Sequence, residues 1–202
     1  MMVGAEVDPI ARVVFYAVIG CWCVFLVTFA LRARWPKSRV TQRDPSAMIG
    51  FFLQAVGYFA VWVAPLQRSQ FSAIVPMPRV AEGALAGLTV ALAVASVWLV
   101  NAASRRLGKH WALAARLVEG HDLIRDGPYR YVRNPIYTGM FGLLLATGLA
   151  MSRWTTLVVA TLVFAVGTVI RIRREERLLR QAFGASFEEY ARKVPALIPG
   201  LY

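Results

Sequence analysis

Asp126-Gly-Pro-Tyr-Arg-Tyr-Val-Arg-Asn-Pro-Ile-Tyr-Thr-Gly139 is a basic, turn-rich strip that leads directly into a long apolar stretch. A second charged cluster, Arg171-Ile-Arg-Arg-Glu-Glu176, follows where that apolar stretch ends. Charged side chains beside lipid are unfavourable by several kcal/mol unless they are paired or face water or a bound molecule. Two such clusters flanking one apolar hairpin therefore predict a membrane-embedded site.

The chain as a whole is too apolar for an ordinary soluble domain. Of its 202 residues, 58% are hydrophobic, and the mean hydropathy is +0.54. A helix needs about 20 apolar residues to cross a bilayer. We expect five transmembrane helices, at Ile10 to Leu31, Ala47 to Leu66, Val80 to Ala103, Ile136 to Met151 and Trp154 to Ile170. The last two are the shortest and are separated only by Ser152-Arg153, which predicts a tight helical hairpin.

The net charge of +12 is distributed unevenly along the chain. Basic residues cluster after the first span, after the third span and in the C-terminal tail, whereas the linkers after the second and fourth spans carry few. This alternation predicts an N-terminus outside and a cytoplasmic C-terminus, by the positive-inside rule. A basic cytoplasmic face would hold anionic lipid head groups, and its position beside the spans argues against nucleic-acid binding.

Two regions of different character are predicted. Residues 1–104 form a scaffold of three apolar spans, and residues 105–202 form the half that would carry the predicted site, made of the strip, the hairpin and a tail helix. The tail helix is expected from about Arg173 to Lys193, ended by Pro195, and lies on the cytoplasmic side. Its amphipathic pattern has an apolar stripe of Leu178, Leu179, Phe183, Phe187 and Tyr190. The expected fold class is an all-α integral membrane protein.

Asn134-Pro135 has two readings. Asn is a favoured N-cap and Pro is favoured at the first helical position, so the pair can simply begin the fourth span. The same helix start offers free N–H groups and partial positive charge, which with Arg133 nearby would hold an anion. The tyrosines of the strip, Tyr129, Tyr131 and Tyr137, are likewise either interfacial aromatics or the walls of a site for a flat ring.

Arg171 and Glu175 lie four residues apart on one helix face, where they form a weak ion pair or bind ligands. The glutamate could accept hydrogen bonds from a ribose or an ammonium group, and the arginine could hold a carboxylate. His121 is isolated in a turn, and Cys21 and Cys23 have no partner ligands nearby in sequence, so we expect no metal site. Without a Gly-x-Gly-x-x-Gly loop we also expect no Rossmann domain.

Together these motifs resemble the isoprenylcysteine carboxyl methyltransferase family and, more widely, the phospholipid N-methyltransferases. The resemblance rests on Gly127 to Gly139, Glu175-Glu176, Phe183-Gly184, Tyr190 and Val194-Pro195 with Ile198-Pro199, and it covers roughly residues 105 to 202. It implies a multi-span membrane enzyme that uses S-adenosyl-L-methionine. Cofactor contacts are then implied at His121, Leu123, Ile124, Tyr129, Asn134, Pro135, Tyr137, Glu175 and Glu176.

The resemblance also implies catalytic roles for Arg171 and Glu175, with Arg171 handling a substrate carboxylate. One position departs from the family pattern, because Asn134 stands where the family usually has histidine. Asparagine can still hydrogen-bond a cofactor carboxylate, but it cannot titrate near neutral pH. The expected partners are the bilayer and a hydrophobic or lipid-linked methyl acceptor, and no oligomeric state is implied.

The reaction implied is in-line attack on a sulfonium methyl group. A carboxylate nucleophile needs no general base, since opposite charges cancel, whereas an amine would need one, for which Glu175 is the candidate. A prenylated cysteine, a free isoprenoid or fatty acid, and a phospholipid amine all remain open as acceptors. Two other readings also stay open: an NADPH-dependent sterol-reductase-like enzyme and a non-catalytic membrane adaptor.

Overall fold

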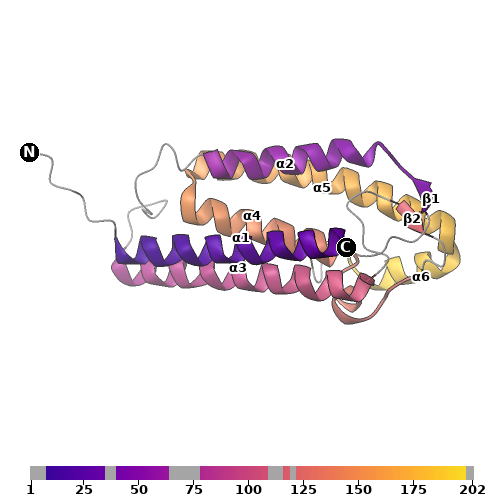
Figure 1. Ribbon diagram of the computed structural model, residues 1–202, viewed down its shortest axis with the longest axis horizontal. Coiled ribbons are helices and arrows are strands. Elements are labelled where there is room, and N and C mark those ends of the chain that lie inside the picture. Colours follow the sequence, from indigo (N-terminus) through magenta and orange to yellow (C-terminus); the bar gives the residue numbers. More distant parts are fainter. Residues whose placement is uncertain (1–7, 35–39, 64–77, 109–115, 119–121, 199–202) are drawn as a thin grey trace, which may run out of the picture.

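The computed structural model describes residues 8–34, 40–63, 78–108, 116–118 and 122–198, and within them the chain is built almost entirely of helices (Figure 1). The long helices, in chain order, are α1 (Pro9–Ala33), α2 (Ala47–Val63), α3 (Arg79–Leu107), α4 (Pro135–Met151) and α5 (Trp154–Phe183). Three smaller pieces lie at one end of the bundle. They are the two-stranded ladder of β1 (Val40–Arg43) with β2 (Arg116–Val118), the 3₁₀ turn η3 (Gly127–Arg130) and α6 (Ala185–Lys193).

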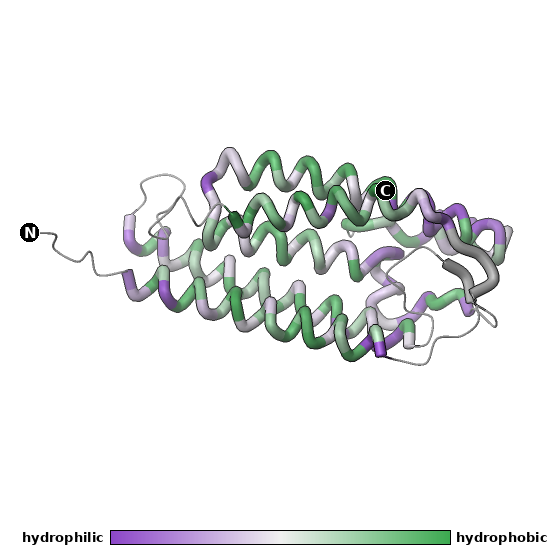
Figure 2. Tube along the Cα trace, turned by 45° about the horizontal axis from the view of Figure 1, so that its top comes forward, coloured by the Kyte–Doolittle hydropathy of each residue, from purple (hydrophilic) through white to green (hydrophobic). Residues whose placement is uncertain are grey.

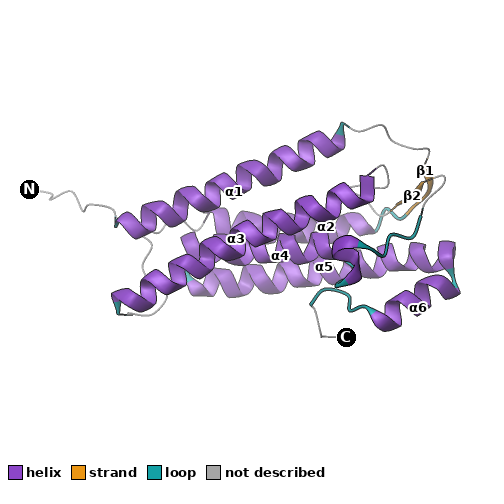
Figure 3. Ribbon diagram, turned by 90° about the horizontal axis from the view of Figure 1, so that it is seen from below, coloured by secondary structure: helices purple, strands orange, loops and turns teal. Residues whose placement is uncertain are grey.

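The five long helices run up and down in one elongated bundle. α2 lies along α5, α1 lies along α3, and α4 lies between these two pairs (Figure 1). Because α1, α3 and α5 run toward the same end, that end collects the basic residues of their last turns, among them Arg32, Arg105 and Arg180. α6 and the two strands lie at the same end (Figure 3). The opposite end carries, among the described residues, the α4–α5 turn, the end of α2 and the starts of α1 and α3.

Three of the described helices, α1, α3 and α5, are long and apolar enough to cross a membrane. α2 and α4 are apolar but have only 17 residues each in the described part of the chain. Large hydrophobic side chains cover the outside of the bundle, for example Phe52 and Phe59 on α2, which are 67% and 68% exposed. Figure 2 shows the apolar middle of the bundle between more polar ends. The predicted second span runs to Leu66, which lies outside the described residues.

One expectation about the C-terminal half is wrong. The tail helix predicted from about Arg173 to Lys193 is not one helix, because α5 continues to Phe183 and the chain turns at Gly184, whose φ is +50°, before α6 begins. A φ of this sign favours glycine, which explains the position of the break. The expected all-helical architecture is confirmed for the described residues, and the structure adds to it one short antiparallel ladder of β1 with β2.

α4 is the buried element of the bundle, and it packs against α3 without room for side chains at two positions. A Cβ on Gly139 would lie 2.7 Å from the carbonyl oxygen of Ser96, and a Cβ on Gly142 would overlap the Ser96 hydroxyl. Side chains of the other helices tie onto the same helix. Tyr58 donates a hydrogen bond to the carbonyl of Met140 at 2.7 Å, and Trp22 donates one to Thr147 at 2.9 Å.

α2 and α5 approach each other even more closely, through glycines on both helices. A Cβ on Gly50 would lie 2.5 Å from the carbonyl oxygen of Gly167 and 2.6 Å from Cγ of Arg171. A Cβ on Gly167 would lie 2.7 Å from the carbonyl oxygen of Gly50. Small residues of this kind let two backbones pack together in an apolar environment. The contact fixes where α5 carries Arg171 relative to α2.

Candidate active site

The first turn of α4 is held by the C-terminal tail. The backbone N–H groups of Arg133 and Asn134 donate to the carbonyls of Pro195 and Ala196 at 2.9 and 3.1 Å. One turn later, the Thr138 hydroxyl donates to the carbonyl of Leu197 at 2.7 Å. The strip and the tail, more than 50 residues apart in sequence, therefore form one rigid unit at the start of α4.

Asn134 is the N-cap of α4 and Pro135 occupies its first turn, as the cap reading predicts. The Asn134 side chain, however, makes no capping hydrogen bond to the helix. Its amide donates instead to the carbonyl of Ala196 at 3.1 Å and, more weakly, to Glu176 at 3.4 Å. The side chain therefore leaves the N–H groups of the first turn to other acceptors, which is compatible with the anion reading.

Arg133 has a structural position in this arrangement. Its Nε donates to Glu176 at 2.9 Å, and its Nη1 donates to the carbonyls of Ala191 and Val194. Glu176 is buried and also pairs with Arg180 at 3.5 Å. Arg133 therefore links α5 to the end of α6 and its tail, and it does not stand ready as an anion ligand beside Asn134.

Tyr137, Arg171 and Glu175 form one compact cluster between α4 and α5. The Tyr137 hydroxyl donates to Oε1 of Glu175, and Nη2 of Arg171 lies 3.5 Å from the same oxygen. The Arg171 guanidinium also lies over the Tyr137 ring, 5.0 Å from its centroid. The two clusters that the sequence places 32 or more residues apart are thus in direct contact, with the Arg171 side chain only 5% exposed.

α2 completes the surroundings of Arg171. Nη1 of Arg171 donates to Oε1 of Gln54 at 3.2 Å, and the guanidinium lies 5.7 Å from the centroid of the Phe51 ring. The sequence analysis did not identify either residue. Phe51 carries no signal in an apolar span, but Gln54 is the one strongly polar side chain between Ala47 and Val63, and such a residue in a span is a functional candidate by default.

The three tyrosines of the strip lie in different environments. Tyr129 and Tyr137 are buried, whereas Tyr131 is 66% exposed and takes the position of an interfacial aromatic. Burial raises the pKa of the Tyr129 phenol well above its ordinary value, and it raises the pKa of Tyr190 to about 12. Both phenols are therefore neutral at physiological pH, and Tyr190 donates to the carbonyl of Tyr129 at 2.6 Å.

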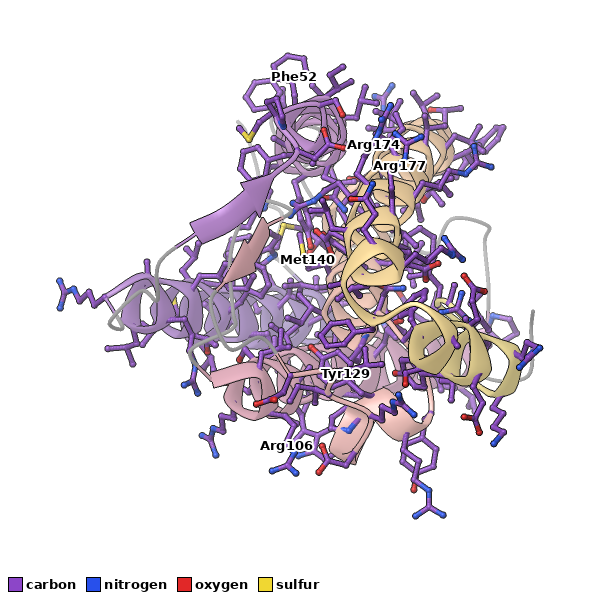
Figure 4. All side chains as sticks on the ribbon, turned by 90° about the vertical axis from the view of Figure 1, so that its right-hand side faces the viewer. Phe52, Arg106, Tyr129, Met140, Arg174 and Arg177 are labelled. Atoms are coloured by element: carbon purple, nitrogen blue, oxygen red, sulfur yellow. The ribbon has the colours of Figure 1, made fainter. Side chains whose placement is uncertain are left out.

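The remaining predicted residues are placed less closely. Leu123 and Ile124 are half-buried in the segment that leads to η3, and His121 lies outside the described residues. Figure 4, which looks along the bundle, shows Met140 near the centre, with Arg174 and Arg177 of α5 above it and Tyr129 below it. Within the part of the chain that the structure describes, no group of three His, Cys, Asp or Glu side chains is placed to hold a metal ion.

Comparison with known proteins is consistent with this arrangement. The family model described as phospholipid methyltransferase matches residues 85–186, which include α4 and α5. The protein-S-isoprenylcysteine O-methyltransferase of Schizosaccharomyces pombe is 37% identical over 87 residues, 43% of this chain and 37% of the relative. The cobalt-zinc-cadmium resistance protein CzcN of Cupriavidus metallidurans is 37% identical over 97 residues, 47% of this chain and 44% of the relative.

A third relative is the nickel-cobalt-cadmium resistance protein NccN of Alcaligenes xylosoxydans xylosoxydans, 29% identical over 113 residues, 55% of this chain and 53% of the relative. The chain thus spans about half or less of the length of these relatives. The family model covers half of the chain, including the strip, the hairpin and the Arg171 cluster. The chain belongs to the phospholipid methyltransferase family.

Proposed function

We propose that the protein is an S-adenosyl-L-methionine-dependent membrane methyltransferase that methylates a carboxylate on an isoprenylcysteine-like or other lipidic acceptor. The observation that carries the proposal is the cluster of Tyr137, Arg171 and Glu175 between α4 and α5. It joins a carboxylate, a phenol and a guanidinium at the edge of an apolar bundle. Family membership and the similarity to isoprenylcysteine O-methyltransferases support the same chemistry.

The residues at the start of α4 fit the cofactor. The cofactor has an amino-acid end with a carboxylate and an ammonium group, a ribose with two hydroxyls, and a flat adenine ring. The first turn of α4 offers N–H groups that Asn134 does not cap, and Glu175 offers a carboxylate. The half-buried Leu123 and Ile124 and the buried Tyr129 would contact the apolar ring faces. Pro135 and Tyr137 would fix the position of the first turn, and His121 stays part of this proposed set.

Glu176 has a different role in the proposed site. Its two oxygens are engaged by Arg133 and Arg180 at 2.9 and 3.5 Å. We therefore assign it to positioning: it keeps α5, the tail and Asn134 in register, and any contact with the cofactor would be secondary to that.

Arg171 is the proposed acceptor-binding group. The bound cofactor would supply an electrophilic methyl group, and the chain would supply the orientation of the nucleophile. A guanidinium binds a carboxylate through parallel N–H donors, which fixes the direction of its oxygens. Holding both reactants in register lowers the barrier without a proton transfer. No general base is required for a carboxylate acceptor.

A phospholipid amine is the second candidate acceptor, favoured by the description of the matching family model. An amine must lose a proton during methylation, and Glu175 is the carboxylate positioned to take it. The two candidates differ in the group that Arg171 would bind, which is the reacting carboxylate in the first and the phosphate beside the amine in the second. A base-labile methyl ester as the product would indicate the carboxylate acceptor, and a base-stable methylamine would indicate the phospholipid.

The proposed placement in the membrane follows the charge distribution. The end of the bundle with α6, η3 and the last turns of α5 would face the cytoplasm, and the N-terminus would lie outside. All five long helices would then cross the bilayer, with α2 and α4 as the short spans. The site would sit at the cytoplasmic surface, within reach of a lipid-linked acceptor.

Binding of S-adenosyl-L-methionine to the purified protein tests the proposal. Isothermal titration in detergent or nanodiscs should show one site, and labelled-methyl transfer to a lipid extract should identify the acceptor. Binding of NADPH in place of S-adenosyl-L-methionine would instead indicate a reductase. Binding of neither would indicate an adaptor that keeps only the fold.

A further inference from the structure

Gln54 is a buried polar residue in the half of the chain that was expected to be scaffold. Only 1% of it is exposed, and it lies in the middle of α2 facing α5. The family match begins at residue 85, so α2 is outside the matched region. A buried primary amide in an apolar helix requires hydrogen-bond partners. Its hydrogen-bond partners are Thr168 and Arg171.

The hydrogen bonds of Gln54 fix the orientation of its amide. Arginine can only donate, so the Gln54 oxygen must face Nη1 of Arg171, at 3.2 Å. The Gln54 NH₂ group then faces Thr168 and donates to its hydroxyl at 2.9 Å. Flipping the amide would place two donors against each other on the Arg171 side. Thr168 therefore holds Gln54 in the one orientation that supports Arg171.

The backbone geometry makes this contact a short-range and rigid one. Gly50 lies one helical turn before Gln54. A Cβ added at Gly50 would clash with the carbonyl of Gly167 and with Cγ of Arg171. α2 also contributes the Phe51 ring, whose centroid lies 5.7 Å from the Arg171 guanidinium. The guanidinium is thus enclosed by α2 on one side and by Tyr137 and Glu175 on the other.

The neutrality of Gln54 matters for what Arg171 can do. A glutamate at this position would neutralise the guanidinium in a buried ion pair and compete with any anionic ligand. An amide oxygen orients the guanidinium but adds no negative charge to that of Glu175, whose Oε1 lies 3.5 Å from Nη2. An arginine held in this way can still attract a carboxylate.

We infer that Gln54 is a positioning residue for carboxylate recognition: held by Thr168, it aims the Arg171 guanidinium at the carboxylate of the methyl acceptor without cancelling its charge. The inference rests on the proposed function insofar as the acceptor is a carboxylate. It assigns part of the site to α2, so the N-terminal half of the chain would contribute to acceptor specificity as well as to packing.

The test compares binding of S-farnesylcysteine and of its carboxyl methyl ester to purified protein in nanodiscs. The two compounds differ by one methyl group, which removes the negative charge that Arg171 would bind. We expect the parent to prefer the acid, Gln54→Met to lose roughly tenfold of that preference, and Gln54→Glu to lose it completely. Thr168→Val keeps the hydrogen bond to Arg171 but frees the amide, so an intermediate loss is expected.

The matched control is Tyr58→Phe, one turn further along α2. It removes the hydrogen bond to the Met140 carbonyl, which ties α2 to α4 and does not touch Arg171. This variant should keep the full preference for the acid. Affinity for S-adenosyl-L-methionine, measured in parallel, should change less than about twofold in all variants. A variant that had lost its structure would not keep this affinity. If Gln54→Met does not fold, Thr168→Val decides.

Acid preference that is the same in the Gln54 variants as in the parent would overturn the inference. So would a parent that binds acid and ester equally, because Arg171 would then have no carboxylate to recognise. Failure of the proposed function has a different signature. A parent that transfers no labelled methyl group to S-farnesylcysteine, yet shows an acid preference that depends on Gln54, would contradict the activity and leave the binding inference standing.

Discussion

Two helices enclose Arg171, and they treat its charge differently. On the α4 side, Tyr137 directs its hydroxyl at Glu175, and Glu175 supplies a negative charge 3.5 Å from the guanidinium. On the α2 side, Gln54 and Phe51 supply a neutral amide oxygen and a ring face. The α4 side is held by hydrogen bonds to the C-terminal tail, and the α2 side by glycine contacts between backbones. The α2 side thus orients the Arg171 guanidinium, and the α4 side balances its charge.

Removing Arg171 should have the largest effect, since both sides converge on it. Arg171→Ala should lower turnover of a carboxylate acceptor by roughly a hundredfold or more and change S-adenosyl-L-methionine affinity much less. Arg171→Lys should restore little, because an ammonium cannot make the bidentate contact. Steady-state methyl transfer together with titration of the cofactor measures both. Equal activity of Arg171→Ala and the parent would remove this residue from the acceptor site.

Removing Arg133 should destabilise the α4 side, because it removes contacts with the C-terminal tail. Arg133→Ala leaves Glu176 with Arg180 and the weak hydrogen bond from Asn134, and it releases the carbonyls of Ala191 and Val194. The free energy of unfolding should fall by about 3 kcal/mol. Thermal unfolding in detergent gives the comparison. Arg130→Ala, an exposed residue of η3, is the control and should change the melting temperature little. An unaltered melting temperature for Arg133→Ala would show that the tail is not anchored through this residue.

Adding a methyl group to Gly50 should break the α2 side. Gly50→Ala forces α2 away from Gly167 and Arg171, which should destabilise the bundle by about 1–3 kcal/mol and weaken acid preference in the farnesylcysteine pair. Gly87→Ala on α3 is the matched control, because nothing lies within 4 Å of the added Cβ. The same stability for both alanine variants would argue against close packing of α2 on α5.

Removing the charge of Glu175 tests its proposed role in cofactor binding. Glu175→Gln keeps the size of the side chain and removes its charge, so affinity for S-adenosyl-L-methionine should fall about tenfold. Tyr137→Phe should lower this affinity by less, since it removes only a neutral hydrogen-bond donor. Isothermal titration measures both constants. Unchanged affinity in Glu175→Gln would place the carboxylate outside the cofactor site.

The α4 side could be predicted from sequence because its chemistry is concentrated. Asn134, Pro135 and Tyr137 stand together at a helix start, and the Arg171 and Glu175 spacing places both on one helix face. The structure adds the contact between them. The structural role of Arg133 could not be predicted, because sequence cannot show that the tail returns to accept hydrogen bonds from this guanidinium. His121 lies in a part of the chain that the structure does not describe.

The α2 side could not be predicted in the same way. A single glutamine in an apolar span indicates that something polar lies opposite, but the identity of that partner depends on which helix packs there. The register of α2 on α5 is set by Gly50 and Gly167, and pairing of two glycines across helices leaves no local pattern. The break at Gly184 and the ladder of β1 with β2 were not predicted for a related reason. Both depend on where the chain turns at the end of the bundle, toward the tail in one case and between helices in the other.

The most direct measurement is transfer of a labelled methyl group from S-adenosyl-L-methionine to S-farnesylcysteine by the purified protein in nanodiscs, compared with Arg171→Ala and Gln54→Met. The account predicts base-labile methyl ester formed by the parent, almost none formed by Arg171→Ala, and a raised KM for the acceptor with Gln54→Met. Absence of transfer by a parent that binds the cofactor, or equal transfer by all three proteins, would contradict it.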